Sequence, residues 1–218
     1  MAVYPLNSKY LSREIKDRLP PGILSHVSLA PGIDGKEGGS YKFAGHIGSY
    51  IEFPNNGRLD VKHSITILCW VYPQSTAGPL FSYSASDNWG VLFWMTKGQL
   101  FAMFSRRDHQ HTRYLFYDAL ALAFNQWHHV GCSYDFISGE ANLWLNGQSV
   151  LKMNIGKEAE LATQEEVRIG AVNMEKRYFQ GRVTDVQVYD VALNAEQIKA
   201  VEGVGQSGNY SKTLIYAN

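Results

Sequence analysis

The sequence has little of what marks several large classes of protein. Its 218 residues include only two cysteines and seven prolines, and no apolar run approaches the roughly 18 residues of a membrane-spanning helix. Lys plus Arg and Asp plus Glu number 20 each, so no net field attracts nucleic acid or an anionic membrane. We therefore expect neither nucleic-acid binding nor membrane insertion.

The familiar enzyme motifs are missing as well. We find no Gly-x-Ser-x-Gly elbow, no phosphate-binding loop and no Cys-x-x-Cys pair. The opening residues 1–5 have neither the basic start nor the apolar stretch of a signal peptide. Long runs of helix-forming residues are scarce, whereas Tyr, Phe and Trp number 13, 10 and 5. This composition favours strands over helices.

Short alternating runs follow one another from residue 40 onward, with turn residues between them. A period of two is typical of strands with one buried face, and the run 64–72 is apolar on both faces, as a central strand would be. Asn146-Gly147 between two such runs predicts a two-residue hairpin. Further strands are expected at 41–43, 50–53, 80–83, 90–95, 100–104, 112–117, 127–134, 140–145, 148–151, 166–170 and 181–189.

One helix is predicted, at about residues 194–201. Asn194 can cap it, Gln197 completes a capping box, and Leu193 can pack onto Ile198. Many short strands, hairpin turns and a single short helix predict an all-β sandwich or jelly roll of two antiparallel sheets.

We expect the chain to be divided into three parts. Residues 1–39 read as an extended N-terminal segment, because proline and glycine turns interrupt them. Residues 40–202 form the sandwich. Residues 203–218 form a tail that begins with a flexible glycine-rich stretch and contains a candidate last strand at 214–216.

Three stretches carry a resemblance to a known family. They are SITILCWVYP at 64–73, QWHHVGCSYD at 126–135 running into LWLNG at 143–147, and the closing segment 169–198 with FQGRVTDVQVY and LNAEQI. In order and spacing they are similar to laminin-G-like and pentraxin domains of the concanavalin A-like superfamily. The resemblance implies a concanavalin A-like jelly-roll sandwich and a non-catalytic binding module, above all a carbohydrate-binding, lectin-like one.

The two cysteines, Cys69 and Cys132, each lie within an apolar strand-like run. On the residues alone, a buried thiol pair and a disulfide fit equally well. Pentraxins join the corresponding two strands by one disulfide, so the resemblance implies a Cys69–Cys132 bond. Such a bond would in turn imply a secreted protein, or the extracellular part of a cell-surface protein.

The loop around Asp87 and Asn88 is a candidate calcium site, because adjacent hard oxygen donors suit Ca²⁺. Pentraxins place an Asp-Asn pair in this loop, which is why the resemblance points to calcium as a cofactor. The family's second ligand group corresponds here to Asn173 and Glu175, and both are displaced from the family pattern. A plain turn at Asp87-Asn88 is the alternative.

A local cluster of cations follows at residues 106–113, despite the zero net charge. Guanidinium groups form bidentate bonds to sulfate or carboxylate, so the cluster is a candidate site for an acidic glycan. Exposed aromatic rings, namely Trp89 with Trp94 and Tyr114, can cover the apolar face of a sugar. The expected ligand-binding residues are Trp89, Arg106, Arg107, His109 and Arg113. A solvated hairpin loop is the alternative.

His128-His129 resembles a metal pair, but successive side chains of a strand point to opposite faces, so we interpret both as structural. Glycoside hydrolases with this sandwich need two flanking carboxylates, usually on a Glu-x-Asp-x-x-Glu run that this chain lacks. We expect no enzyme. The candidate partners are a glycan or glycosaminoglycan, an extracellular protein bound by an adhesion or matrix module, and further copies of the chain.

Overall fold

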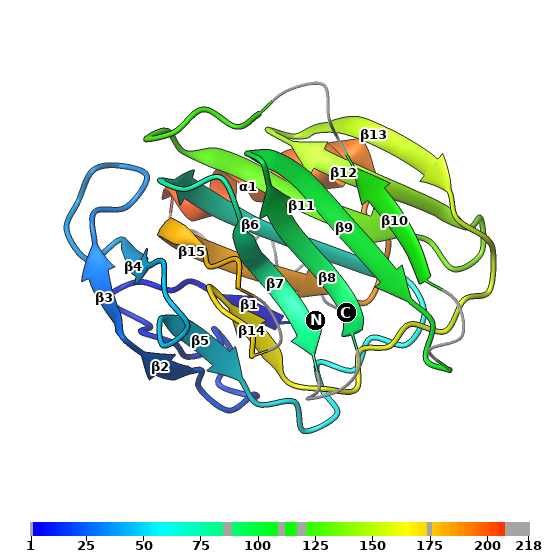
Figure 1. Ribbon diagram of the computed structural model, residues 1–218, viewed down its shortest axis with the longest axis horizontal. Coiled ribbons are helices and arrows are strands. Elements are labelled where there is room, and N and C mark those ends of the chain that lie inside the picture. The colour runs from blue at the N-terminus through cyan, green and yellow to red at the C-terminus, as the bar shows by residue number, and fades with distance from the viewer. Residues whose placement is uncertain (1, 85–88, 109–111, 117–120, 174–175, 208–218) are drawn as a thin grey trace.

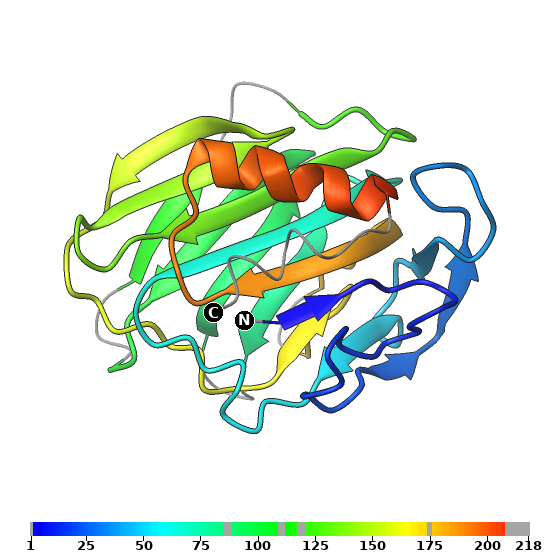
Figure 2. The same ribbon diagram turned by 180° about the vertical axis from the view of Figure 1, so that it is seen from behind.

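The computed structural model describes residues 2–84, 89–108, 112–116, 121–173 and 176–207. Two antiparallel sheets pack face to face, and the helix of the described part crosses the outer face of one of them (Figures 1 and 2). The predicted all-β jelly-roll sandwich is confirmed. No helix among the described residues is long and apolar enough to cross a membrane.

The strands are arranged in two sheets, each with a regular antiparallel order. The eight-stranded sheet runs β13 (Gln148–Asn154), β12 (Glu140–Leu145), β11 (His128–Tyr134), β6 (Ile65–Pro73), β15 (Gln180–Tyr189), β4 (Ser40–Ala44) and β3 (Val27–Ala30), with β1 (Ala2–Tyr4) also paired to β15. The seven-stranded sheet runs β10 (Thr112–Phe116), β9 (Gln99–Ser105), β8 (Trp89–Thr96), β7 (Gly78–Ser84), β14 (Val167–Ile169), β5 (Tyr50–Phe53) and β2 (Ile23–Ser25).

Strand β6 is buried on both faces, as its doubly apolar sequence predicted. Ile65, Ile67, Cys69 and Val71 join the core between the sheets, because alternate side chains of a strand share one face. Leu68 lies on the other face and packs beneath the helix. The Asn146-Gly147 hairpin also forms as predicted, and both residues have positive φ, 48° and 75°.

The N-terminal segment contributes to both sheets. β1 is fully buried against β15, while β2 and β3 are the last strands of the two sheets. The core therefore includes side chains from the first residues of the chain, such as Tyr4, whose ring lies 4.2 Å from that of Phe53.

The helix α1 (Ala195–Ser207) is longer than predicted. Its start is the expected capping box, in which the Gln197 amide N–H donates to Asn194 Oδ1 and the Asn194 N–H donates to Gln197 Oε1, each at 2.9 Å. The prediction that the chain becomes flexible at Gly203 is wrong. Val201 and Val204 are buried against the sheet and the N-terminal segment, and this burial extends the helix. The candidate strand 214–216 lies outside the described residues.

The predicted disulfide is not formed. Cys69 and Cys132 are both buried free thiols. The register of β6 and β11 places Cys69 opposite Val130 and Cys132 opposite Ile67, so the two cysteines are diagonal neighbours. A diagonal pair lies about 7–8 Å apart, beyond the roughly 4.4–6.8 Å between Cα atoms that a disulfide spans. The extracellular location thus gains no support from a bond.

Asp185 is a fully buried acid at an irregularity in β15, with φ of 52°. Its Oδ2 accepts a bond from Gln187 Nε2 at 2.7 Å, and Gln187 Oε1 accepts one from the Tyr189 hydroxyl at 2.6 Å. Its Oδ1 has no partner among the described residues. Burial raises the pKa of Asp185 to about 7, although the Gln187 bond partly opposes this.

The two thiols should behave as buried groups. Burial raises the pKa of both Cys69 and Cys132, and the thiolate is the form that reacts. We expect neither to be alkylated in the folded domain, and both to be alkylated after unfolding without reductant, as read by mass spectrometry. A protein that takes no label after unfolding under these conditions would contradict the free-thiol structure.

Asp185 should make stability depend on pH. Its folded pKa lies above the ordinary 3.8, so folding favours the protonated acid. That contribution is complete below about pH 4 and disappears as the pH rises to about 7, a loss of up to about 4 kcal/mol at roughly 1.4 kcal/mol per pKa unit. In urea titrations, Asp185→Asn should gain stability relative to wild type over this interval. Parallel pH curves for the two proteins would refute the assignment.

Candidate functional site

The outer face of strands β8, β9 and β10 carries a group of aromatic side chains that we call the aromatic platform: Trp89, Trp94, Phe101 and Tyr114. These strands lie at the front of the molecule in Figure 1. The platform borders an open cavity of about 230 Å³, which Leu92, Met103 and Arg177 also line. The structure thus brings together Trp89, Trp94 and Tyr114, the three rings that the sequence suggested as a sugar-stacking surface, but Trp94 is buried rather than exposed, because it packs with Leu92, Met103 and Val172.

The rings of the platform support one another. Trp89 and Trp94 meet edge to face at 5.6 Å, and Phe101 and Tyr114 stack at 5.9 Å with 28° between their planes. Tyr114 is 56% exposed, so its outer ring face is open to solvent. The Arg177 guanidinium lies 5.0 Å from the centre of the Trp94 ring and adds positive charge and N–H donors at the edge of the cavity.

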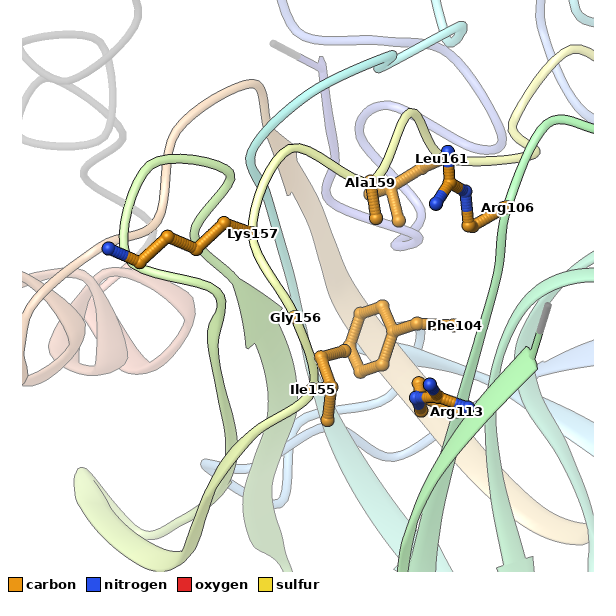
Figure 3. A pocket seen from close by; sticks show the side chains of 8 residues that line it. All are labelled: Phe104, Arg106, Arg113, Ile155, Gly156, Lys157, Ala159 and Leu161. Carbon is orange, nitrogen blue, oxygen red and sulfur yellow. The ribbon is translucent and has the colours of Figure 1, made fainter.

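Arg106 and Arg113 line a second, smaller cavity of about 110 Å³ (Figure 3). Phe104, Ile155 and Leu161 form its apolar surface, and the backbone at Gly156 passes beside it. The register pairs Arg113 with Phe104 and Tyr114 with Met103. Arg113 therefore lies on the inner side of the edge strand β10, while Tyr114 lies on its outer side.

Arg107 lines neither cavity. Its guanidinium forms a two-pronged ion pair with Asp60, with Nη1 2.9 Å from Oδ1 and Nη2 bonded to Oδ2. Asp60 also accepts a bond from the Thr163 hydroxyl at 2.9 Å, and the Arg107 bond is the main reason that the pKa of Asp60 is lowered. The structure gives Arg107 a structural partner, and does not bring it together with Arg106 and Arg113. His109 lies outside the described residues.

The candidate calcium ligands are Asp87, Asn88, Asn173 and Glu175. Asp87, Asn88 and Glu175 lie outside the described residues, and Asn173 is exposed. The side-chain oxygen of Asn173 accepts a bond from Arg168 Nη1 at 2.8 Å, and a guanidinium at that oxygen does not fit a cation ligand. Among the described residues, no group of three or more His, Cys, Asp or Glu side chains is placed to hold a metal.

The two adjacent histidines are structural, as predicted. The His129 ring is completely buried 5.2 Å from the ring of Trp70, and burial lowers its pKa to about 3, so it stays neutral. His128 is also buried, and its Nε2 lies 2.9 Å from the Ala123 carbonyl oxygen. Their side chains take no part in either cavity.

A family profile described as "Concanavalin A-like lectin/glucanases superfamily", of laminin G type, matches residues 44–199. The chain belongs to this superfamily. Comparison with curated proteins finds no match. The match covers most of the sandwich, including every strand that bears the aromatic platform.

Solved structures with this concanavalin A-like fold include binding domains. The botulinum neurotoxin serotype G binding domain aligns with a TM-score of 0.70 and 14% identity over 90% of this chain and 49% of that one, so this chain spans about half its length. Domain 4 of a GH43 extracellular arabinanase from Geobacillus stearothermophilus, solved with arabinotriose, aligns with a TM-score of 0.67 and 16% identity over 91% and 95% of the two chains. A heptameric SAP-like pentraxin from Limulus polyphemus gives 0.56 and 21% over 80% of each.

Sequence reasoning missed several residues of this superfamily member's two cavities. Phe101 and Met103 stand on a strand whose outward face becomes known only from its register with β10. Arg177 comes from a loop far along the chain, and nothing in the local sequence links it to Trp94. The alternation of β9 was the one available signal, since it puts residues 101 and 103 on one face and 104 on the other.

Arg107 and Arg106 should differ in what they contribute to stability. Arg107→Ala leaves the part-buried Asp60 without its cation and should lower the free energy of unfolding by about 1–3 kcal/mol. Arg106→Ala is the matched control, because its ion pair with Asp108 is exposed and 3.7 Å long, and it should cost less than about 0.5 kcal/mol. Urea denaturation measures both, and equal losses would show that the Asp60 pair is not structural.

Proposed function

We propose that this domain is a non-catalytic carbohydrate-binding module that holds a sugar ring on the aromatic platform. The observation that carries the proposal is an already assembled ring surface, in which the exposed Tyr114 and the half-buried Trp89 meet the buried Trp94 at a cavity of about 230 Å³. The C–H face of a pyranose or furanose ring is apolar and packs on an aromatic face, while its hydroxyls require nearby donors. The Arg177 guanidinium supplies such donors.

The lining of the platform supports binding rather than hydrolysis. Glycoside hydrolysis requires two carboxylates that flank the scissile bond. The described residues that line the cavity are aromatic, apolar or cationic, and none is an acid. Domain 4 of the arabinanase, solved with arabinotriose, is a domain of the same fold in complex with an oligosaccharide, which favours a glycan partner over a protein partner.

The smaller cavity supports an acidic glycan. Arg106 and Arg113 can form charged hydrogen bonds to a carboxylate or sulfate group of the glycan. Phe104 and Ile155 would contact the carbon atoms next to that group. At about 110 Å³ the cavity is smaller than the ~150 Å³ cavity that holds benzene, so it suits a substituent rather than a sugar ring. Because Arg113 and Tyr114 are consecutive, a glycan that passes over the edge strand β10 can contact both cavities.

Two further parts of the proposal concern setting and cofactor. An extracellular location fits a glycan-binding role, and the arabinanase with a similar domain is extracellular. Calcium is proposed at Asp87 and Asn88, which directly precede Trp89 of the platform in the sequence. The binding experiment therefore includes arms with calcium and with a chelator.

A glycan array with neutral and acidic oligosaccharides tests the function. Tyr114→Ala removes the exposed ring and should weaken binding to retained glycans about tenfold. Phe124→Ala, which removes a comparably exposed ring away from the platform, should bind as wild type. Arg113→Ala should weaken the binding of acidic glycans only, and the loss should be larger at low salt. A wild-type domain that binds no glycan with or without calcium would overturn the proposal in favour of protein adhesion.

A further inference from the structure

A polar groove lies on the opposite side of the molecule, on the outer face of the eight-stranded sheet. Its volume is about 370 Å³, within the size range of small-molecule sites. Ser133 of β11 and Asn142 and Trp144 of β12 lie along it, and the segment 192–194 and the first residue of α1 line it as well. Figure 2 shows α1 crossing this face beside β12 and β13.

The strand register explains why these residues meet. Ser133 pairs with Asn142, and Asn142 pairs with Lys152 of β13, so three polar side chains form a row across adjacent strands. Their inward neighbours Cys132, Ala141 and Leu143 are core residues, which sends this row to the outer face. Trp144 then packs with Leu193 beneath α1 and supplies the apolar part of the groove.

The buried polar groups of the groove are only partly bonded to one another. Ser133, 2% exposed, accepts a bond from Trp144 Nε1 at 2.9 Å, and its own hydroxyl proton has no acceptor within the described part of the chain. Asn142, 7% exposed, accepts from the Ser149 hydroxyl at 2.8 Å and donates one N–H to Glu140 at 3.2 Å. The structure gives its second N–H no acceptor among the same residues.

Acceptors stand at the rim of the groove. Asp135 Oδ1 accepts from the Ser138 amide at 2.7 Å, while its Oδ2 bonds to none of the described residues. Glu140 is held by Lys152, whose Nζ lies 2.8 Å from Oε2, and this bond lowers the pKa of Glu140, which is therefore ionised at neutral pH. The groove thus presents unused donors on its floor and a carboxylate acceptor at its end, next to an aromatic ring.

We propose that this groove is a second saccharide-binding site, for a neutral sugar of one or two units. A sugar hydroxyl both donates and accepts, so one hydroxyl can take the bonds offered by Ser133 and Asn142 while another donates to Asp135. An isolated anion would meet the Asp135 and Glu140 carboxylates, and a wholly apolar ligand would leave the buried donors unpaired. A neutral polyhydroxyl compound avoids both problems, because it carries no negative charge and its hydroxyls can bond to the buried donors.

The site has a consequence for the domain as a whole. The aromatic platform and the groove lie on the outer faces of different sheets, so they face opposite directions (Figures 1 and 2). A glycan in one does not obstruct the other. The groove stands independently of the proposed function, and if both sites are filled, a single chain joins two glycans.

The indole N–H signal of Trp144 reports on the groove directly, because that N–H is bonded to Ser133. It is one of five tryptophan signals, assigned by Trp144→Phe. We would titrate the full chain with methyl glycosides of glucose, galactose, mannose, fucose, xylose and N-acetylglucosamine. At least one should shift the Trp144 signal, and Asn142→Ala should weaken that binding about tenfold, the effect of losing one hydrogen bond.

Two further variants keep the test decisive. Asp135→Asn retains the bond to Ser138 and should also weaken binding of the sugar. This variant tests the site even if Asn142→Ala fails to fold. Tyr114→Ala should leave the Trp144 shift unchanged, whereas it weakens binding at the platform, so that the two sites can fail separately. If none of the six glycosides moves the Trp144 signal, the groove is a structural network and the proposal is wrong.

Discussion

The packing of the two inner sheet faces against each other determines where every other side chain of the domain can go. Alternate residues of each strand must enter the shared core, and the remaining residues are directed outward. On β9 this sends Ala102 and Phe104 inward and Phe101 and Met103 outward. The aromatic platform is a consequence, because the outward rings of three adjacent strands have no second layer above them in the described structure.

The two outer faces differ because α1 covers only one of them. Its capping box fixes where the helix begins, and Ile198 and Val201 pack it onto Leu68 and Tyr189. The groove lies beside the start of the helix, over β11, β12 and β13, and the polar row that includes Asn142 lines it there. One face of the sandwich thus has an aromatic surface, and the other a polar one bounded by a helix.

Much of the fold followed from the sequence, because it depends on local patterns. The Asn146-Gly147 turn, the doubly apolar β6 and the Asn194–Gln197 cap each have a signal within a few residues. The candidate sites were only partly predictable, because they depend on long-range pairing. Trp89, Trp94 and Tyr114 were identified as one ring surface, but their meeting depends on the strand register, and so does the burial of Trp94.

Failures of prediction had the same origin. Arg107 belongs to a cationic run in the sequence, yet it bonds to Asp60, 47 positions away, and no local pattern shows this. Family analogy suggested a disulfide, whereas the register sets Cys69 and Cys132 on a diagonal. Helix α1 continues past Gly203 because Val204 contacts residues near the N-terminus, including Val3, another contact that local sequence does not reveal.

The methionine methyl groups provide the most direct test that a sugar binds on the aromatic platform. Met103 lines the platform cavity, Met95 of the next strand faces the core, and Met153 is exposed on β13. During titration with a glycan retained on the array, the account predicts that the Met103 methyl resonance shifts while those of Met95 and Met153 remain in place. A glycan that binds with no change at Met103 would show that the sugar sits elsewhere, and would contradict the account.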